Sequence, residues 1–473
     1  MPVAAQYRPD PLFAALGPEF ADPVAAARFP QHILRRRNQA WAESVGLGAL
    51  DGDEWQAHFA RFEPLPDNMA VPLAMRYHGH QFRVYNPDIG DGRGFLFAQL
   101  RDSAGRLLDL GTKGSGQTPY SRRGDGRLTL KGGVREVLAA EMLEALGVVT
   151  SKALSLFETG EALTRGDEPS PTRSSVLVRL QHSHIRFGTF QRLDYVERPD
   201  LMATLVDHCA EAYFPDLLPL DTEARAAGLL QHAVRENARL AASWMAAGFV
   251  HGVLNTDNLT ITGESFDYGP WRFVPSSEPG FTAAYFDENG LYAFGRQPEA
   301  VSWALAQLAG ALSLVCPIPP LQAALAGFAP AYRTALRSHV FARLALAKGE
   351  IDADLEFLQS LFAWLTESQV GWAQFFHDWV GGEASRARAA DSPQAASYRR
   401  GDFSPIADGL AARTRAESGV FLADRYFERR RPVSLLIDEV EKLWAAIAER
   451  DDWSLFEAKL KEIEDLKLVC GRP

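Results

Sequence analysis

The chain has 473 residues, with 60 acidic and 49 basic side chains and a formal charge of −11 at pH 7. This length exceeds the ~100–200 residues of one domain, so two or more domains are expected. The acidic balance argues against a general nucleic-acid-binding protein, which would present a basic surface. Three cysteines are too few for a disulfide framework and indicate a reducing compartment.

No segment has the pattern of a membrane anchor or a leader. The N-terminal stretch lacks a basic segment followed by an apolar core, so we expect no signal peptide. The most apolar stretch begins at Ala300, contains serine and glutamine, and ends at prolines before reaching the ~20 apolar residues that a membrane-spanning helix requires. We therefore expect a buried helix there, and a cytoplasmic protein with no membrane partner.

The patterning divides the chain into three regions. Residues 1–70 are punctuated by proline and contain helical patches, which predicts a helical extension. In residues 71–195, short apolar runs alternate with glycine-rich turns, as in strands, and one amphipathic helix interrupts them. Residues 196–473 have helical periodicity, apart from a polar, small-residue stretch at 381–402 that predicts a surface loop. A strand-rich lobe before a helical lobe is the order of a protein kinase, so we predict an α+β, kinase-like two-lobe fold.

Two glycine-rich loops lie in the strand-rich region. The first contains Gly90, Gly92 and Arg93, and the second contains Asp125 and Gly126. Glycine has no Cβ, so its backbone N–H groups can approach phosphate oxygens, and arginine adds a permanent charge. A glycine-rich hairpin turn has the same local appearance. Two such loops around one strand lysine favour a polyphosphate site.

That lysine is Lys113, which ends a strand pattern 23 residues before Glu136 in the predicted helix. A strand lysine paired with a helix glutamate positions nucleotide phosphates in kinases, although two surface charges can have the same spacing. Arg179 lies among apolar strand residues, where an unpaired charge is costly to bury. We expect it to face a carboxylate or a phosphate, or else to lie on a solvent-exposed edge.

Two histidines, His182 and His184, lie between Arg179 and Arg186. Their spacing resembles that of metal ligands. No third ligand accompanies them in the sequence, so we interpret them as hydrogen-bonding histidines rather than as a metal site.

The stretch "HGVLNTDN" ends at Asn258, and Asp267 opens the sequence Asp-Tyr-Gly. His251 and Asn258 keep the seven-residue step of the kinase catalytic loop, but Val253 stands where the catalytic aspartate is expected. Asn258 and Asp267 offer the hard oxygen ligands that Mg²⁺ prefers. Asp257 is the nearest carboxylate that can act as a general base. Aspartate and asparagine also favour ordinary turns, so a turn remains an alternative.

Taken in order, eight motifs resemble those of selenoprotein O and its bacterial relatives. They are "YHGHQF", "GDGRG", "KGSGQTPYSRRGDGR", "REVLAAE", "HIRFG", "HGVLNTDN", "DYGPW" and "YAFGRQP". They cover roughly residues 75 to 300, and the two ends of the chain match more loosely.

The resemblance implies a kinase-like enzyme that binds ATP with Mg²⁺ or Mn²⁺ in a flipped orientation. Such an enzyme transfers AMP to serine, threonine or tyrosine hydroxyls of proteins and releases pyrophosphate. The implied proton acceptor is Asp257, and the implied metal ligands are Asn258 and Asp267. The implied nucleotide-binding residues are Gly90, Gly92, Arg93, Lys113, Asp125, Gly126, Glu136, Arg179, Arg186 and Asp267.

Two other functions stay open: an atypical kinase that transfers the γ-phosphate, and a nucleotide-binding scaffold without turnover. One departure from the family concerns cysteine. Many members carry selenocysteine or cysteine near the C-terminus, where this chain has Cys470, and many bacterial members have a second cysteine after the Asp-Tyr-Gly motif. The corresponding stretch "PGFTAAYFDENGLYAF" has none, so we expect Cys470 to be a free thiol.

Overall fold

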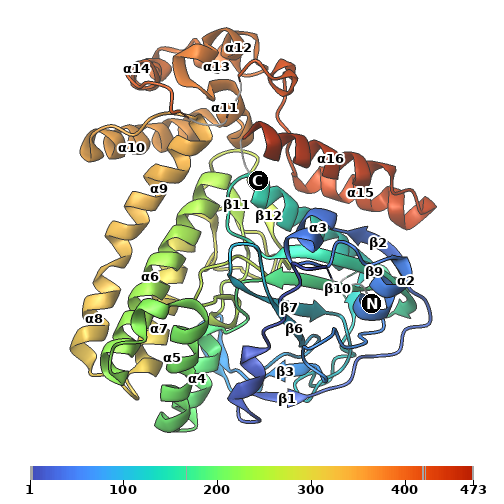
Figure 1. Cartoon of the computed structure of the whole chain (residues 1–473). Coiled ribbons are helices and arrows are strands. Elements are labelled where there is room, and N and C mark those ends of the chain that lie inside the picture. The colour runs from blue at the N-terminus through green and yellow to red at the C-terminus, as the bar shows by residue number, and fades with distance from the viewer. Residues whose placement is uncertain (1–3, 167, 418–419, 421, 471–473) are drawn as a thin grey trace.

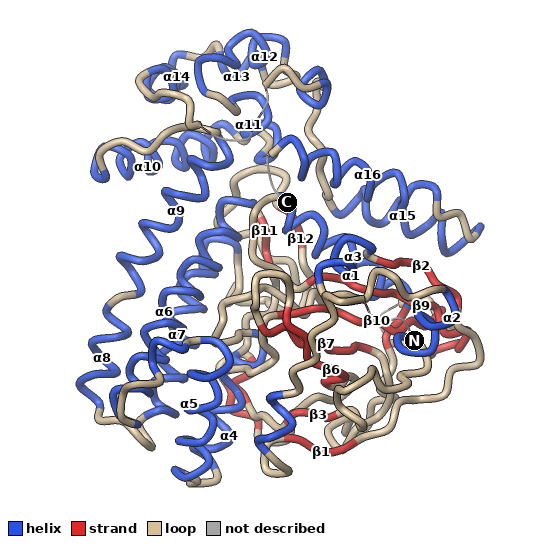
Figure 2. The backbone as a smooth tube through the Cα atoms, viewed as in Figure 1, coloured by secondary structure: helices blue, strands red, loops and turns tan. Residues whose placement is uncertain are grey.

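The computed structural model describes residues 4–166, 168–417, 420 and 422–470. Strands are concentrated before residue 182 and helices make up most of the remainder, so the chain is α+β (Figure 2). The strands are β1 (Ala21–Pro23), β2 (Ile33–Arg37), β3 (Leu73–Met75), β4 (Gly79–Gln81), β5 (Val84–Asn86), β6 (Leu96–Arg101), β7 (Leu107–Lys113), β8 (Leu128–Thr129), β9 (Lys152–Leu163), β10 (Thr172–Gln181), β11 (Phe249–Val250) and β12 (Arg272–Phe273).

The helices fall into three groups in space (Figure 1). The first group lies on or beside the sheet: α1 (Gln39–Ser44), α2 (Gly52–Phe59) and α3 (Leu130–Ala145), with α15 (Ile437–Arg450) and α16 (Ser454–Val469). The second forms the helical body: α4 (Phe187–Tyr195), α5 (Pro199–Tyr213), α6 (Thr222–Ala247), α7 (Gln297–Leu312), α8 (Ile318–Ala326) and α9 (Phe328–Leu344). The third packs at the far end of α9: α10 (Ile351–Ser368), α11 (Trp372–Trp379), α12 (Arg386–Asp391), α13 (Ala395–Tyr398) and α14 (Ser404–Ala411).

One antiparallel sheet organises the strand-rich part. Its strand order is β1-β3-β6-β7-β10-β9-β2, and β8 pairs with part of β10. Alternate residues of a strand point to opposite faces. On β7, Leu108 and Leu110 pack into an apolar core with residues of α1 and α2. Asp109 and Lys113 therefore point to the other face, where Lys113 meets α3.

Residues 1–70 are not simply the helical extension that the sequence predicted. They contain α1 and α2, but β1 and β2 from this segment form the two edges of the central sheet. Both strands are short, one ends in Pro23, and the other reads "ILRRR". Proline and charged residues are typical of edge strands, which do not need the apolar alternation of a central strand. The sequence pattern therefore gave no strand signal here.

Helix α6 spans the helical body and leads directly into the stretch that contains Asn258. Gly248 ends the helix in the left-handed conformation, with φ 71°. The amide of Gln297, at the start of α7, then holds the following segment: its Nε2 donates to the Phe249 carbonyl at 2.8 Å, and its Oε1 accepts from the His251 N–H at 3.0 Å. Two helices thus fix the start of this loop.

Helix α7 covers most of the apolar stretch that begins at Ala300, and its core-facing residues are buried, as expected. No helix in the described part of the chain is long and apolar enough to cross a membrane. Residues 381–402, expected to form a loop, instead contain α12 and α13. These helices are only six and four residues long, too short to produce a clear periodic pattern.

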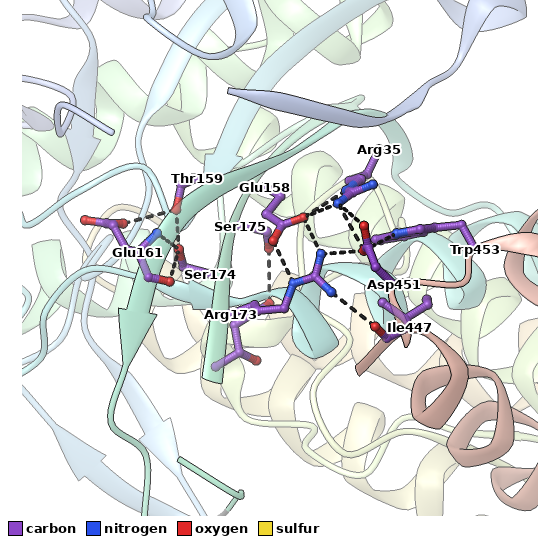
Figure 3. A network of polar contacts seen from close by, with 11 residues as sticks. Arg35, Glu158, Thr159, Glu161, Arg173, Ser174, Ser175, Ile447, Asp451 and Trp453 are labelled. Carbon is purple, nitrogen blue, oxygen red and sulfur yellow. Dashed lines mark hydrogen bonds and ion pairs between the residues drawn. The ribbon is translucent and has the colours of Figure 1, made fainter. Parts of the chain in front are cut away.

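The C-terminal helices are attached to the sheet by a network of charges (Figure 3). Glu158 on β9 pairs with Arg35 of β2 at 2.7 Å and with Arg173 of β10 at 2.6 Å. Both arginines also reach Asp451, which lies between α15 and α16, and the Trp453 ring packs on Arg35 at 4.5 Å. Helix α16 packs on α3 (Figure 1), so this network supports the helix that carries Glu136.

We predict that the two carboxylates of this network contribute unequally to stability. Glu158→Ala should lower the free energy of unfolding by about 3 kcal/mol, because it leaves two arginines without their buried partner. Asp451 has a side chain that is 55% exposed, so Asp451→Ala should cost about 1 kcal/mol or less. Denaturant titration of both variants measures the difference. Equal losses would contradict the assignment of Glu158 as the centre of the network.

Candidate active site

A cleft of about 780 Å³ lies between the sheet and the helical body. This volume is within the range of small-molecule sites. Of the residues predicted from the sequence, Glu136 lies behind the cleft wall and the rest border the cleft. Those bordering residues are Gly90, Gly92, Arg93, Lys113, Asp125, Gly126, Arg179, Arg186, Asp257, Asn258 and Asp267.

Three cations surround the carboxylate of Asp267 at the inner end of the cleft. Arg179 donates to Oδ1 at 2.6 Å, Arg186 donates to Oδ2 at 2.8 Å, and Lys113 Nζ lies 3.4 Å from Oδ1. Lys113 also forms the expected ion pair with Glu136 of α3. The side chains of Lys113, Arg179 and Arg186 are 4–7% exposed. The partner of Arg179 in this structure is thus a carboxylate.

This cluster determines the ionisation of Asp267. Burial alone would raise its pKa, but Arg179, Lys113 and Arg186 hold the pKa of Asp267 well below its usual range. The residue has φ 60°, in the left-handed region, which directs the side chain from the Asp-Tyr-Gly turn back to the cluster. A carboxylate oxygen has two lone pairs, so Oδ2, which accepts from Arg186, can still bind a further cation.

Arg186 connects this cluster to the loop that carries Asp257. It precedes α4, and its Nη1 also donates to the backbone carbonyl of Asp257 at 2.5 Å. Its guanidinium lies against the rings of Tyr77 and Phe266, at 4.8 and 4.7 Å from their centroids. The arginine is therefore held by charge and by stacking, and it bridges the Asp267 carboxylate and the backbone of Asp257.

Asp257 and Asn258 belong to the short 3-10 helix η3 (Thr256–Asn258), and both are half-buried at the cleft. Oδ1 of Asp257 has no hydrogen-bond partner among the described residues. Burial raises the pKa of Asp257 to about 6, although the charge of Arg186 opposes the shift. An unpartnered carboxylate oxygen beside a cleft has the arrangement of a general base.

The sequence gave no indication of the hairpin β4–β5, which covers this loop. The His80 N–H donates to Thr256 Oγ1 at 2.7 Å, and the Phe82 N–H donates to Asn255 Oδ1 at 2.9 Å. Gln81, between them, borders the cleft beside Asp257. The motif "YHGHQF" marked the segment, but its contacts join residues more than 170 positions apart and only the fold reveals them.

The two glycine-rich loops contact each other at the cleft mouth. Thr118 Oγ1 donates to the Asp91 carbonyl at 2.5 Å. A Cβ on Gly90 would lie 2.5 Å from the Tyr120 ring, so glycine is needed there for packing between the loops. Arg93 is exposed at this mouth, and Asp125 is exposed and paired with Arg165 at 2.8 Å. These rim residues are therefore accessible from solvent.

The described residues include no group of three or more histidine, cysteine, aspartate or glutamate side chains positioned to hold a metal ion. The His182 N–H donates to Glu264 Oε2 at 2.6 Å, and His184 donates to Asp109. Cys470 is partly buried at the C-terminal end of α16.

Comparison with known proteins agrees with the motifs. Residues 3–464 match the family model described as Protein adenylyltransferase SelO. A relative from Gloeobacter violaceus, named Protein nucleotidyltransferase YdiU, is 45% identical over 94% of this chain and 93% of its own. Proteins of the same name from Trichodesmium erythraeum and Myxococcus xanthus are 43% and 36% identical, over 96% and 98% of this chain and 98% and 94% of theirs. The chain therefore belongs to the SelO family and is a nucleotidyltransferase.

Proposed function

We propose that the chain transfers AMP from ATP to a serine, threonine or tyrosine hydroxyl of a protein and releases pyrophosphate. The observation that carries this proposal is the cluster of Lys113, Arg179 and Arg186 around Asp267, with Asp257 beside it. Three nearly buried cations suit a polyphosphate, and a neighbouring carboxylate with one unpartnered oxygen suits an acceptor hydroxyl.

The orientation of the nucleotide is part of the proposal. A base-first orientation would place adenine at the inner end of the cleft, which needs apolar walls. That end is instead formed by Arg179, Lys113 and Asp267. Charged walls favour a nucleotide that enters with its distal phosphates first, so that the α-phosphate remains nearer to Asp257. The same orientation accounts for Val253, which has no proton-accepting group at the kinase base position.

In this mechanism Asp257 accepts the proton of the acceptor hydroxyl as its oxygen attacks the α-phosphorus. Lys113, held by Glu136, and the two arginines neutralise the charge that develops on the departing pyrophosphate. The kinase-like two-lobe arrangement is proposed on the same grounds: the strand lysine comes from the sheet, and the loop with Asp257 comes from the helical body.

Asn258 and Asp267 fit a hard divalent cation, because both supply oxygen atoms to one cleft. Such an ion, when bound, would polarise the phosphates. Asp267 is already surrounded by three cations, which oppose the addition of two more positive charges. The polyanionic nucleotide removes that opposition. We therefore propose that Mg²⁺ or Mn²⁺ enters together with ATP.

Transfer of radioactive label tests the proposed reaction. The enzyme incubated with a protein mixture should transfer label from α-labelled ATP and not from γ-labelled ATP, and Asp267→Ala should transfer neither. Intact-mass analysis should then find modified proteins heavier by one adenylate. Incorporation from γ-labelled ATP alone would instead identify an atypical kinase, which the Lys113–Glu136 pair also suits. ATP binding without any incorporation would identify a scaffold.

Replacement of the proposed base should separate catalysis from binding. Asp257→Asn keeps the size of the side chain, so ATP affinity should change by less than about 3-fold, while the transfer rate falls about 10²–10⁴-fold. Asp88→Asn, which alters an exposed carboxylate in the bend after β5, is the matched control and should keep the full rate. A normal transfer rate in Asp257→Asn would remove Asp257 from the mechanism.

Metal binding should depend on the nucleotide. We predict that Mn²⁺ binds at least about 10-fold more tightly in the presence of α,β-methylene-ATP than to the protein alone, because the three cations at Asp267 repel a free ion. Titration followed by electron paramagnetic resonance measures both affinities. Tight Mn²⁺ binding to the nucleotide-free protein that is lost in Asp267→Asn would contradict this dependence.

A further inference from the structure

His184 is a buried histidine at the inner end of the cleft that the proposed mechanism does not use. Its ring borders the cleft, and its side chain is 6% exposed. Nδ1 lies 3.2 Å from Asp109 Oδ2, whereas Nε2 has no hydrogen-bond partner among the described residues. A buried polar atom without a partner is uncommon and calls for a physical reason.

The position of the ring follows from the register of the sheet. Asp109, Gly111 and Lys113 share one face of β7, with successive positions about 7 Å apart. Gly111 pairs with Arg179 of β10, and a Cβ on Gly111 would lie 2.2 Å from His184 Nε2. The ring therefore occupies space that only glycine leaves free. It lies over the same face as Lys113 and beside the strand position of Arg179.

Asp109 fixes the orientation of the ring. Its carboxylate is 2% exposed and accepts hydrogen bonds from Gln99 Nε2 at 2.7 Å and from the His184 N–H at 2.8 Å. The nearby Nδ1 then donates its proton to the same carboxylate. Because Nδ1 is engaged, Nε2 is the nitrogen directed away from Asp109. When Nδ1 and Nε2 both carry a proton, the ring is a cation, and Nε2 can donate a hydrogen bond to an anion.

We propose that His184 Nε2–H donates a hydrogen bond to the β- or γ-phosphate of bound ATP and so binds the departing pyrophosphate. This inference rests on the proposed function. In the reaction, the acceptor oxygen forms a bond to the α-phosphorus, and the bond from that phosphorus to the bridging oxygen breaks. Pyrophosphate leaves with the electron pair, Asp257 takes the hydroxyl proton, and His184 keeps its own.

Two substitutions distinguish the nitrogens of the ring. In His184→Asn the side-chain amide can replace Nδ1 and keep the bond to Asp109, but nothing replaces Nε2. In His184→Gln the longer side chain reaches the Nε2 position instead. Calorimetry with ATP, pyrophosphate and AMP gives the affinity of each variant, and thermal unfolding verifies that each is folded. His182→Asn is the control, because that ring packs on Tyr213 at 5.3 Å and does not border the cleft.

We expect His184→Asn to weaken the binding of ATP and pyrophosphate about 10–100-fold, the effect of one hydrogen bond to a charged group, and to change AMP binding by less than about 3-fold. His184→Gln should recover most of the loss, and His182→Asn should resemble the unchanged protein.

Three results would overturn the inference. Equal losses of affinity for ATP and AMP would place the nucleoside, not the distal phosphates, at His184. A greater loss of ATP affinity in His184→Gln than in His184→Asn would show that His184 acts only through its hydrogen bond to Asp109. Unchanged ATP affinity in both would show that Nε2 does not reach the nucleotide. Because these measurements need no acceptor protein, they are independent of the label-transfer experiment. Label transfer from γ-labelled ATP alone would overturn the proposed function, while the contrast between ATP and AMP would still decide the contact of His184.

Discussion

The ionised carboxylate of Asp267 is the centre on which the rest of the cleft depends. It joins β7 through Lys113, β10 through Arg179 and the start of α4 through Arg186. A nearly buried charge without a partner is strongly unfavourable, so each of these four groups requires the others. The sheet and the helical body are thereby connected at the inner end of the cleft. When a nucleotide binds, the three cations can interact with its phosphates in place of part of their interaction with the Asp267 carboxylate.

The parts of the molecule far from the cleft support this centre in two ways. Helix α3 supplies Glu136, and the C-terminal helices, attached to the sheet by Glu158 and Asp451, pack on α3. On the opposite wall, α6 and α7 hold the start of the loop that carries Asp257, and the β4–β5 hairpin covers it. A change at the C-terminus can therefore alter the Lys113–Glu136 pair without contacting the cleft.

The clustering of the charged residues was predictable only in part from the sequence, because a charge among apolar strand residues either has a partner or lies at a solvent-exposed edge. Arg179 illustrates this, since its burial requires a partner and Asp267 is that partner. The edge strands β1 and β2 were not predictable, because short strands with proline or arginine have no apolar alternation. The orientation of His184 was not predictable either. It depends on the register that places Gly111 opposite Arg179, which no local pattern encodes.

The proposed mechanism depends most directly on which end of ATP lies at the inner end of the cleft. A crystal structure with Mg²⁺ and α,β-methylene-ATP measures this at once. We predict that the β- and γ-phosphates lie among Lys113, Arg179 and His184, and that the α-phosphate lies nearest to Asp257. Adenine at the inner end, with the γ-phosphate beside Asp257, would contradict the account.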